Sequence, residues 1–204
     1  NEEGVGRALR QSTVPREDVF VTTKLWNSDQ GYDSTLRACE KSLERLGLDA
    51  VDLYLIHWPV KGKFKDSWRA MERLKEEGKC RSIGVSNFLP HHLDELMDGA
   101  KDVPTVNQVE FHPRLQSPKL QEYCRRHDIR LEAWAPMMRG KVEEIPELVQ
   151  IGKAHGKSAV QVTLRWMIQK EIITIPKSVH RERIEANAAI FDFELSDEEI
   201  AKIE

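Results

Sequence analysis

The chain has 204 residues, of which 40% are hydrophobic and 32% charged, with 31 Lys and Arg against 34 Asp and Glu. The net charge of −3 excludes a strongly basic nucleic-acid binder, and the apolar content suffices for a packed core, which argues against disorder. No run approaches the ~18 consecutive apolar residues of a membrane-spanning helix. We therefore expect one domain over residues 1–204, in a monomeric cytoplasmic protein without nucleic-acid or membrane partners.

Short runs rich in β-branched residues predict six strands, at Val19–Lys24, Val51–His57, Ser82–Asn87, Thr105–Phe111, Ile129–Ala135 and Ile172–Lys177. Helical spacing predicts a helix over Tyr32–Leu46, where Leu36, Cys39, Leu43 and Leu46 lie three or four residues apart. The same reasoning predicts further helices at 67–77, at 118–127, at two places within 145–169 that residues 156–158 separate, and from about residue 180.

This alternation of strands and helices predicts parallel strands with helical crossovers, in either an open doubly wound sheet or a (β/α)₈ barrel. The open dinucleotide-binding sheet favours G-x-G-x-x-G after its first strand. Here Gly4-Val5-Gly6 is the only G-x-G; it follows no visible strand and lacks the third glycine. Polar or aromatic residues instead end one strand after another, as expected of a barrel that carries its active site at the carboxyl ends of its strands.

Two of these strand ends, Lys24 and His57, suggest a site that acts on a carbonyl group. Leu53, Leu55 and His57 share one face of their strand, and neighbouring strands lie about 4.8 Å apart. A lysine cation beside a neutral imidazole would stabilise negative charge on a carbonyl oxygen. The alternatives are a lysine that extends to solvent and a core histidine.

Later strand ends suggest a cofactor site. Asn87 and Gln108 offer amides that could bind a flat carboxamide, and Trp134 offers an aromatic face, unless it is a core tryptophan. Lys177 and Arg183 flank a strand end and a helix start, where a phosphate would be favoured, unless they are only part of a solvated charged segment.

Five segments together resemble the aldo-keto reductases, in particular bacterial members of the glyoxal and 2,5-diketo-gluconate reductase type. They are Thr22-Thr23-Lys24-Leu25-Trp26, Leu55-Ile56-His57-Trp58-Pro59, Gly84-Val85-Ser86-Asn87-Phe88, Asn107 to Pro113, and Ile175-Pro176-Lys177-Ser178 through Arg183 and Asn187. The resemblance runs in order from residue 1 to residue 204. It implies a (β/α)₈ barrel that uses NADPH to reduce aldehydes and ketones, its small-molecule carbonyl substrates.

The resemblance also implies roles for individual residues. Lys24 would lower the pKa of a proton-donating tyrosine, and His57 would orient the carbonyl. Contacts to the nicotinamide, the adenosine 2′-phosphate and the adenine would come from Ser86, Asn87, Gln108, Trp134, Lys177, Ser178, Arg183 and Asn187. Trp26 and Trp58 would line the substrate pocket, and no metal is expected.

The sequence departs from the family pattern at three points. Ala186 replaces a polar residue beside Asn187, and Ala135-Pro136-Met137 replaces Ser-Pro-Leu, which suggests a contact from Arg139 instead. The catalytic aspartate and tyrosine precede a Gly-Asn-Glu-Glu segment in the family, and Asn1-Glu2-Glu3 matches its end. We therefore expect two strands with the aspartate and tyrosine to precede Asn1, and six of the eight βα units to lie in these residues.

Two alternative functions remain open on the sequence. One is a Schiff-base lyase on a barrel with Lys24 as nucleophile. The other is a cofactor-binding barrel without turnover. Cys39, Cys80 and Cys124 are far apart and show no metal-binding spacing, so we expect reduced thiols.

Overall fold

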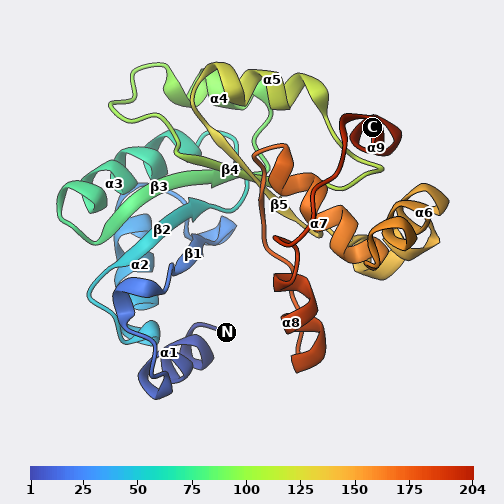
Figure 1. Ribbon diagram of the computed structural model, residues 1–204. Coiled ribbons are helices and arrows are strands. Elements are labelled where there is room, and N and C mark those ends of the chain that lie inside the picture. The colour runs from blue at the N-terminus through green and yellow to red at the C-terminus, as the bar shows by residue number, and fades with distance from the viewer. The chain divides into compact units, whose positions relative to one another are not determined.

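The computed structural model describes residues 1–204 and shows an α/β protein (Figure 1). Six strands form one sheet in chain order. The pairs β1 with β2, β2 with β3, and β5 with β6 are parallel. The predicted alternation of parallel strands and helices is therefore confirmed. The chain forms two compact units, 1–107 and 108–204, which are described separately; the expectation of one domain stays a prediction.

The first unit holds most of the predicted early elements. Its helices and strands are α1 (Glu2–Gln11), β1 (Thr22–Leu25), α2 (Tyr32–Leu46), β2 (Val51–Ile56), α3 (Phe64–Glu76), β3 (Cys80–Ser86) and α4 (Pro90–Met97), with β4 (Val106–Glu110) starting at its end. Short 3₁₀ turns occur at 16–18 and 27–29. All six residues of β2 are buried, as a central parallel strand requires.

Helix α2 has the bounds that its apolar spacing predicts. Cys39, Leu43 and Leu46 are buried on one side, and the helix ends at Gly47, whose φ of 67° is the left-handed conformation that glycine adopts without strain. Gly6 packs against this end of α2, because a Cβ there would lie 2.3 Å from the Leu46 carbonyl oxygen. The G-x-G segment is thus part of helix α1, and its second glycine permits close packing of two helices.

The second unit contains the rest of β4 and the elements α5 (Pro118–Arg126), β5 (Arg130–Trp134), α6 (Pro146–His155), α7 (Ala159–Gln169), β6 (Ile173–Thr174), α8 (Arg181–Ala188) and α9 (Asp197–Ile203). The predicted break between α6 and α7 is confirmed. Gly156 ends α6 with a φ of 65°, and Ser158 begins α7 by accepting the Gln161 N–H at 3.2 Å.

Several predicted bounds were wrong. Strand β6 has two residues rather than six; Pro176 has no N–H to donate to a ladder, so the strand ends before it. The first strand begins at Thr22 rather than Val19; the N–H of Val21 donates to the Asp52 carboxylate instead of to a neighbouring strand. Helices α1, α4 and α9 were not predicted.

Candidate active site

The ends of β1 and β2 bring Lys24 and His57 to one face of the first unit. Lys24 is paired in register with Leu55, and His57 lies two residues beyond Leu55 on the same face. The backbone N–H of His57 donates to the Leu25 carbonyl at 3.2 Å. Lys24, Trp26 and His57 all line one open pocket of about 320 Å³. The two strands are therefore neighbours, and the roles of Lys24 and His57 stay predictions.

The imidazole of His57 is held neutral. Burial, and then the positive charge of Lys24, lower its pKa below the ordinary value. Its Nδ1 is buried without a hydrogen-bond partner. The Trp26 ring lies 4.7 Å from the His57 ring between centroids, tilted by 37°. Trp26 and Trp58 are 59% and 45% exposed, so large aromatic faces remain accessible beside the histidine.

The turn after β3 carries two of the expected cofactor residues, Ser86 and Asn87. Asn87 has a φ of 62°, uncommon for a residue other than glycine, and its Nδ2 donates to the Ser86 hydroxyl and to the His57 carbonyl, both at 3.0 Å. Asn107 supports the turn, because its Nδ2 donates to the Phe88 carbonyl at 2.9 Å while its Oδ1 accepts the Phe88 N–H. Sequence reasoning gave Asn107 no role of its own.

In the second unit, Gln108 on β4 and Trp134 at the end of β5 are placed by their strands. Gln108 is buried, and its Nε2 donates to the carboxyl oxygen Oε1 of Glu132. Glu132 shares its face of β5 with Trp134 by alternation, and it is also buried. Sequence reasoning missed Glu132. Ala135 follows with a φ of 52°, so the chain leaves this strand end in a strained conformation of the kind found at functional sites.

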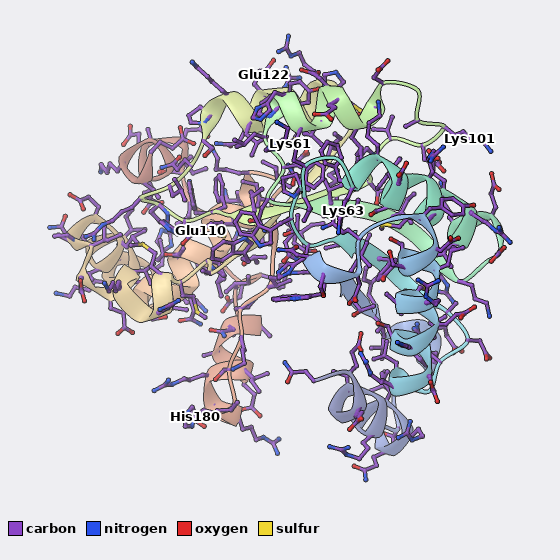
Figure 2. All side chains as sticks on the ribbon, turned by 180° about the vertical axis from the view of Figure 1, so that it is seen from behind. Lys61, Lys63, Lys101, Glu110, Glu122 and His180 are labelled. Carbon is purple, nitrogen blue, oxygen red and sulfur yellow. The ribbon has the colours of Figure 1, made fainter.

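The residues expected to bind a phosphate group lie around the start of α8. Lys177 and Arg183 are exposed, and neither forms an ion pair, whereas Arg181 of the same helix pairs with Glu185 at 2.7 Å. The Ser178 hydroxyl accepts the N–H of His180, the residue labelled in Figure 2 just before the helix. A loop serine and two unneutralised cations fit a phosphate group.

Helix α8 is tied to α7 by a side chain rather than by a buried face. It has no buried residue, and the Gln161 Nε2 donates to the carbonyls of Ala186 and Ala189, each at 3.1 Å. Asn187, on the same helix, is half-buried. Ala186 thus contributes its backbone to anchoring the helix, although its methyl side chain offers no polar contact.

None of the three tyrosines matches a proton donor beside His57. Tyr54 lies on β2, where alternation turns it to the face opposite His57, and it is 0% exposed with a hydroxyl that has no hydrogen-bond partner. Burial raises its pKa above the ordinary value. Tyr123 is buried on α5, with its ring stacked on His127. Tyr32 begins α2, and Arg69 lies over its ring.

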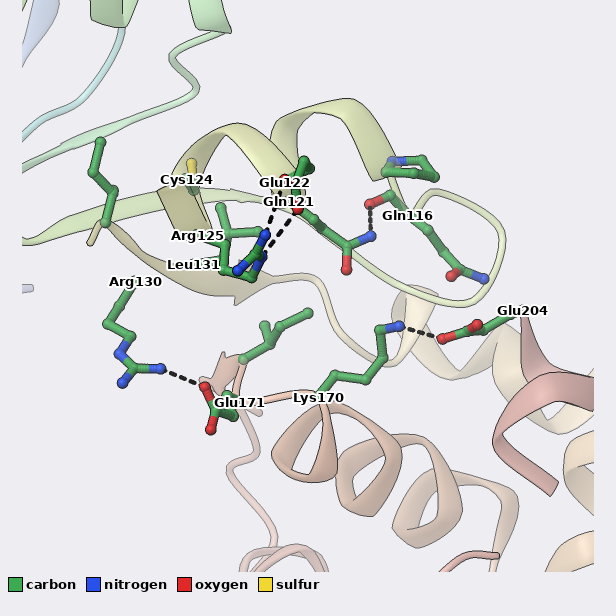
Figure 3. Close-up of a pocket in the computed structure, with 13 residues that line it drawn as sticks. Gln116, Gln121, Glu122, Cys124, Arg125, Arg130, Leu131, Lys170, Glu171 and Glu204 are labelled. Atoms are coloured by element: carbon green, nitrogen blue, oxygen red, sulfur yellow. Dashed lines mark hydrogen bonds and ion pairs between the residues drawn. The ribbon is translucent and has the colours of Figure 1, made fainter. Parts of the chain in front are cut away.

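A pocket of about 430 Å³ in the second unit is a less suitable site (Figure 3). Its charged residues pair with one another: Arg125 with Glu122 at 3.0 Å, Arg130 with Glu171 at 2.8 Å, and Lys170 with Glu204. Since these ion pairs neutralise its walls, nothing there points to a charged ligand. No group of three or more His, Cys, Asp or Glu side chains is placed to hold a metal ion.

None of the three cysteines forms a disulfide bond, and all three are buried. The structure brings two of them together despite 41 residues of separation, with Cys39 Sγ 3.9 Å from Cys80 Sγ. This distance is a contact between thiols and well beyond a disulfide bond of ~2.05 Å.

The comparison with known proteins identifies the class. The model of the aldo/keto reductase family matches residues 1–204, and the chain belongs to this family. It is 57% identical to glyoxal reductase of Bacillus subtilis (strain 168) over 204 residues, and 54% identical to the 9,11-endoperoxide prostaglandin H2 reductase of Trypanosoma cruzi (strain CL Brener) over 207 residues. All of this chain is covered in both cases, with 74% and 73% of those proteins.

Solved structures agree. A crystal structure of a Bombyx mori aldo-keto reductase in complex with NADP superposes with a TM-score of 0.92 at 35% identity, covering 99% of this chain and 73% of that one. The predictions of the family, of its α/β barrel fold class and of an NADP-dependent oxidoreductase acting on carbonyl groups are thereby confirmed. No helix of the structure has the length and apolar character needed to cross a membrane. The roles of individual residues stay predictions.

Proposed function

We propose that this protein reduces aldehydes and ketones to alcohols with NADPH, and that residues 1–204 act as one catalytic domain. The observation that carries the proposal is the placement of Lys24 and His57 on adjacent parallel strands, in one pocket, with the imidazole held neutral. A neutral imidazole has one N–H to donate, which suits a carbonyl oxygen better than a second cation would.

The chain's own residues divide the work as follows. His57 donates a hydrogen bond that orients the substrate carbonyl, and the Lys24 ammonium stabilises the negative charge that develops as the carbonyl is reduced. Such preorganised groups act more strongly where solvent is displaced. The exposed faces of Trp26 and Trp58 bind the apolar part of the substrate.

The cofactor residues form two sets. Ser86, Asn87, Gln108 and Trp134 would bind the nicotinamide end of NADPH, which supplies the hydride when bound. The adenosine end would be held by Lys177, Ser178, Arg183 and Asn187. The donor types support this division, because the first set offers amides, a hydroxyl and an aromatic ring, while the second offers cations that lack a carboxylate partner.

We infer that the proton donor is a tyrosine that precedes Asn1 in the polypeptide, because Tyr54 is buried on the opposite face of β2 from His57. The intact mass of the purified protein, measured on the sample used for activity, tests this. A polypeptide of only 23.6 kDa with full reductase activity would overturn the inference, because a positioned general acid contributes about 10²- to 10⁴-fold.

Glyoxal is the first substrate to test, given the 57% identity to a glyoxal reductase. The assay measures NADPH consumption against glyoxal and a panel of larger aldehydes and ketones. Quenching of tryptophan fluorescence by NADPH with carbonyl-dependent oxidation supports the proposal. Trapping of a carbonyl substrate on Lys24 by borohydride would instead indicate the Schiff-base lyase, and tight NADPH binding without turnover would indicate a binding protein.

A further inference from the structure

Glu132 is a buried acidic residue that the proposed reaction does not use. It lies on β5 with 6% of its surface exposed, and its Oε1 accepts a hydrogen bond from the Nε2 of Gln108, which is 2% exposed on β4. Burying a carboxyl group is costly unless it is hydrogen-bonded. An alanine or leucine at this buried strand position would cost less free energy of desolvation. The presence of a carboxyl group bonded to Gln108 therefore needs an explanation.

The hydrogen-bonding groups of Gln108 and Glu132 explain the contact. A glutamine amide can turn its oxygen and nitrogen ends around, and either orientation fills the same space. A carboxylate has only acceptors, so it selects the orientation in which the amide nitrogen of Gln108 faces Glu132. The amide oxygen of Gln108 is then fixed at the other end of the group, as an acceptor.

The pair lies beside a residue that the proposed function assigns to the cofactor. Glu132 shares one face of β5 with Trp134, and Gln108 lies on β4. Gln108 is one of the residues that the proposed function assigns to the nicotinamide carboxamide, a group with one NH₂ donor and one carbonyl acceptor.

We propose that Glu132 is a positioning residue for NADPH. By holding the Gln108 nitrogen, it presents the Gln108 oxygen as the acceptor for the carboxamide NH₂ of the cofactor. This inference rests on the proposed function, since it requires Gln108 to meet the nicotinamide. It assigns Glu132 a role in reading the carboxamide, beyond that of a packed core residue.

The test compares NADPH with its 3-acetylpyridine analogue, in which a methyl ketone replaces the carboxamide and the NH₂ donor is lost. Equilibrium dissociation constants for both are measured on the full protein, its Glu132→Gln variant and its Glu132→Asp variant. 2′,5′-ADP serves as a probe of the adenosine end alone, and thermal unfolding confirms that each variant is folded. If Glu132→Gln does not fold, Glu132→Asp is compared with Gln108→Met, which fills a similar volume and offers no amide acceptor.

In the unmodified protein we expect the analogue to bind about tenfold more weakly than NADPH, because a buried acceptor loses its partner. In Glu132→Gln this ratio should fall to about threefold or less, since a second amide lets Gln108 turn its nitrogen to the ketone oxygen. Glu132→Asp should retain the preference, and Gln108→Met in the alternative design should abolish it, because methionine offers no amide oxygen as acceptor. 2′,5′-ADP should bind every variant alike.

An unchanged ratio in Glu132→Gln, with both dinucleotides weakened equally, would overturn the positioning role and leave a structural one. Unmodified protein that binds 2′,5′-ADP and NADPH but shows no preference over the analogue would overturn it too. Failure of the unmodified protein to bind any of the three compounds would overturn the proposed function itself, which separates the two ideas.

Discussion

The side-chain nitrogen Nδ2 of Asn87 lies 3.0 Å from the backbone carbonyl oxygen of His57, so the end of β3 holds the end of β2. Asn87 makes this contact from a left-handed backbone conformation, with a φ of 62°. Asn107 secures the same turn through both the N–H and the carbonyl of Phe88. The histidine of the candidate site is therefore fixed through its backbone while its ring remains half-buried beside Trp26.

The electrostatic coupling of Lys24 and His57 is open to direct measurement. Replacing Lys24 by Met should raise the pKa of His57, because the nearby positive charge disfavours a second one. The value should stay below that of a free histidine, since burial is the larger cause of the lowered pKa. An NMR titration of the His57 ring protons gives the result. Lys65→Met, which removes a surface lysine paired with Asp98, serves as control and should leave the titration unchanged.

Cofactor preference should depend on Arg183 and not on its neighbour Arg181. Arg183→Ala should lower the ratio of the NADH to the NADPH dissociation constant at least about tenfold. The reason is that a charge-assisted contact to a phosphate contributes roughly 1.5–3 kcal/mol. Arg181→Ala is the matched control: this arginine already pairs with Glu185, and its loss should change the preference little. Dissociation constants for both dinucleotides decide the matter, and equal affinities in the unmodified protein would refute the phosphate assignment.

Asp52 should be a major contributor to the stability of the first unit. Its carboxylate is 4% exposed and accepts from Arg16 at 2.7 Å, from Arg81 at 2.9 Å and from the Val21 N–H at 2.8 Å. Asp52→Ala should destabilise the protein by roughly 2–4 kcal/mol, because the N–H groups that donate to the buried carboxylate lose their acceptor. Arg81→Ala removes a largely exposed partner and should cost only about 0–1 kcal/mol. Urea unfolding near neutral pH measures both.

The contribution of Asp52 should also depend on pH. Burial raises the pKa of this carboxyl, but the Val21 N–H and the two arginines outweigh burial and lower it overall. A carboxyl with a lowered pKa in the folded state stabilises the fold above the pKa of the unfolded chain, ~3.9, and loses that stabilisation as the pH falls through the folded pKa. The difference between the unmodified protein and Asp52→Ala should therefore shrink on acidification. A difference that grew instead would contradict this account.

Two glycines of α1 should respond in opposite ways to the same substitution. Gly6→Ala places a Cβ 2.3 Å from the Leu46 carbonyl oxygen, so the helices must move apart, at a cost of roughly 1–3 kcal/mol. Gly4→Ala meets only the tip of Arg7 at 3.8 Å and should stabilise the helix by roughly 0.5–1 kcal/mol. Thermal or urea unfolding of both variants checks the sign; destabilisation by Gly4→Ala would show that α1 packs differently.

Local patterns in the sequence were sufficient for much of the fold. Helix α2 could be bounded because its apolar residues repeat at helical spacing and Gly47 ends it. Helix α4 was missed, since only Leu93 and Leu96 are buried in its eight residues, too few for a period to stand out. Strand β6 was overestimated because an apolar run resembles a strand whether or not a neighbour pairs with it.

The candidate site shows the same division between local and distant information. Lys24 and His57 could be found because alternation along a strand assigns a face to each residue. Asn107 and Glu132 could not be found, because each acts through a hydrogen-bond partner that is distant in the chain, by 19 and 24 residues respectively. Cys39 and Cys80, 41 residues apart, were likewise not expected to touch. Such contacts depend on the register between strands, which cannot be read from a single sequence.

The central claim is that His57 acts on the carbonyl substrate while other residues bind NADPH. Steady-state turnover of glyoxal by the protein and by its His57→Ala variant, with NADPH affinity measured on the same samples, tests it most directly. The account predicts a fall in kcat of at least about tenfold, equivalent to ~1.4 kcal/mol of transition-state stabilisation, with NADPH affinity nearly unchanged. A variant that turns over normally at saturation but binds NADPH much more weakly would contradict the account and leave His57 as a residue of the core.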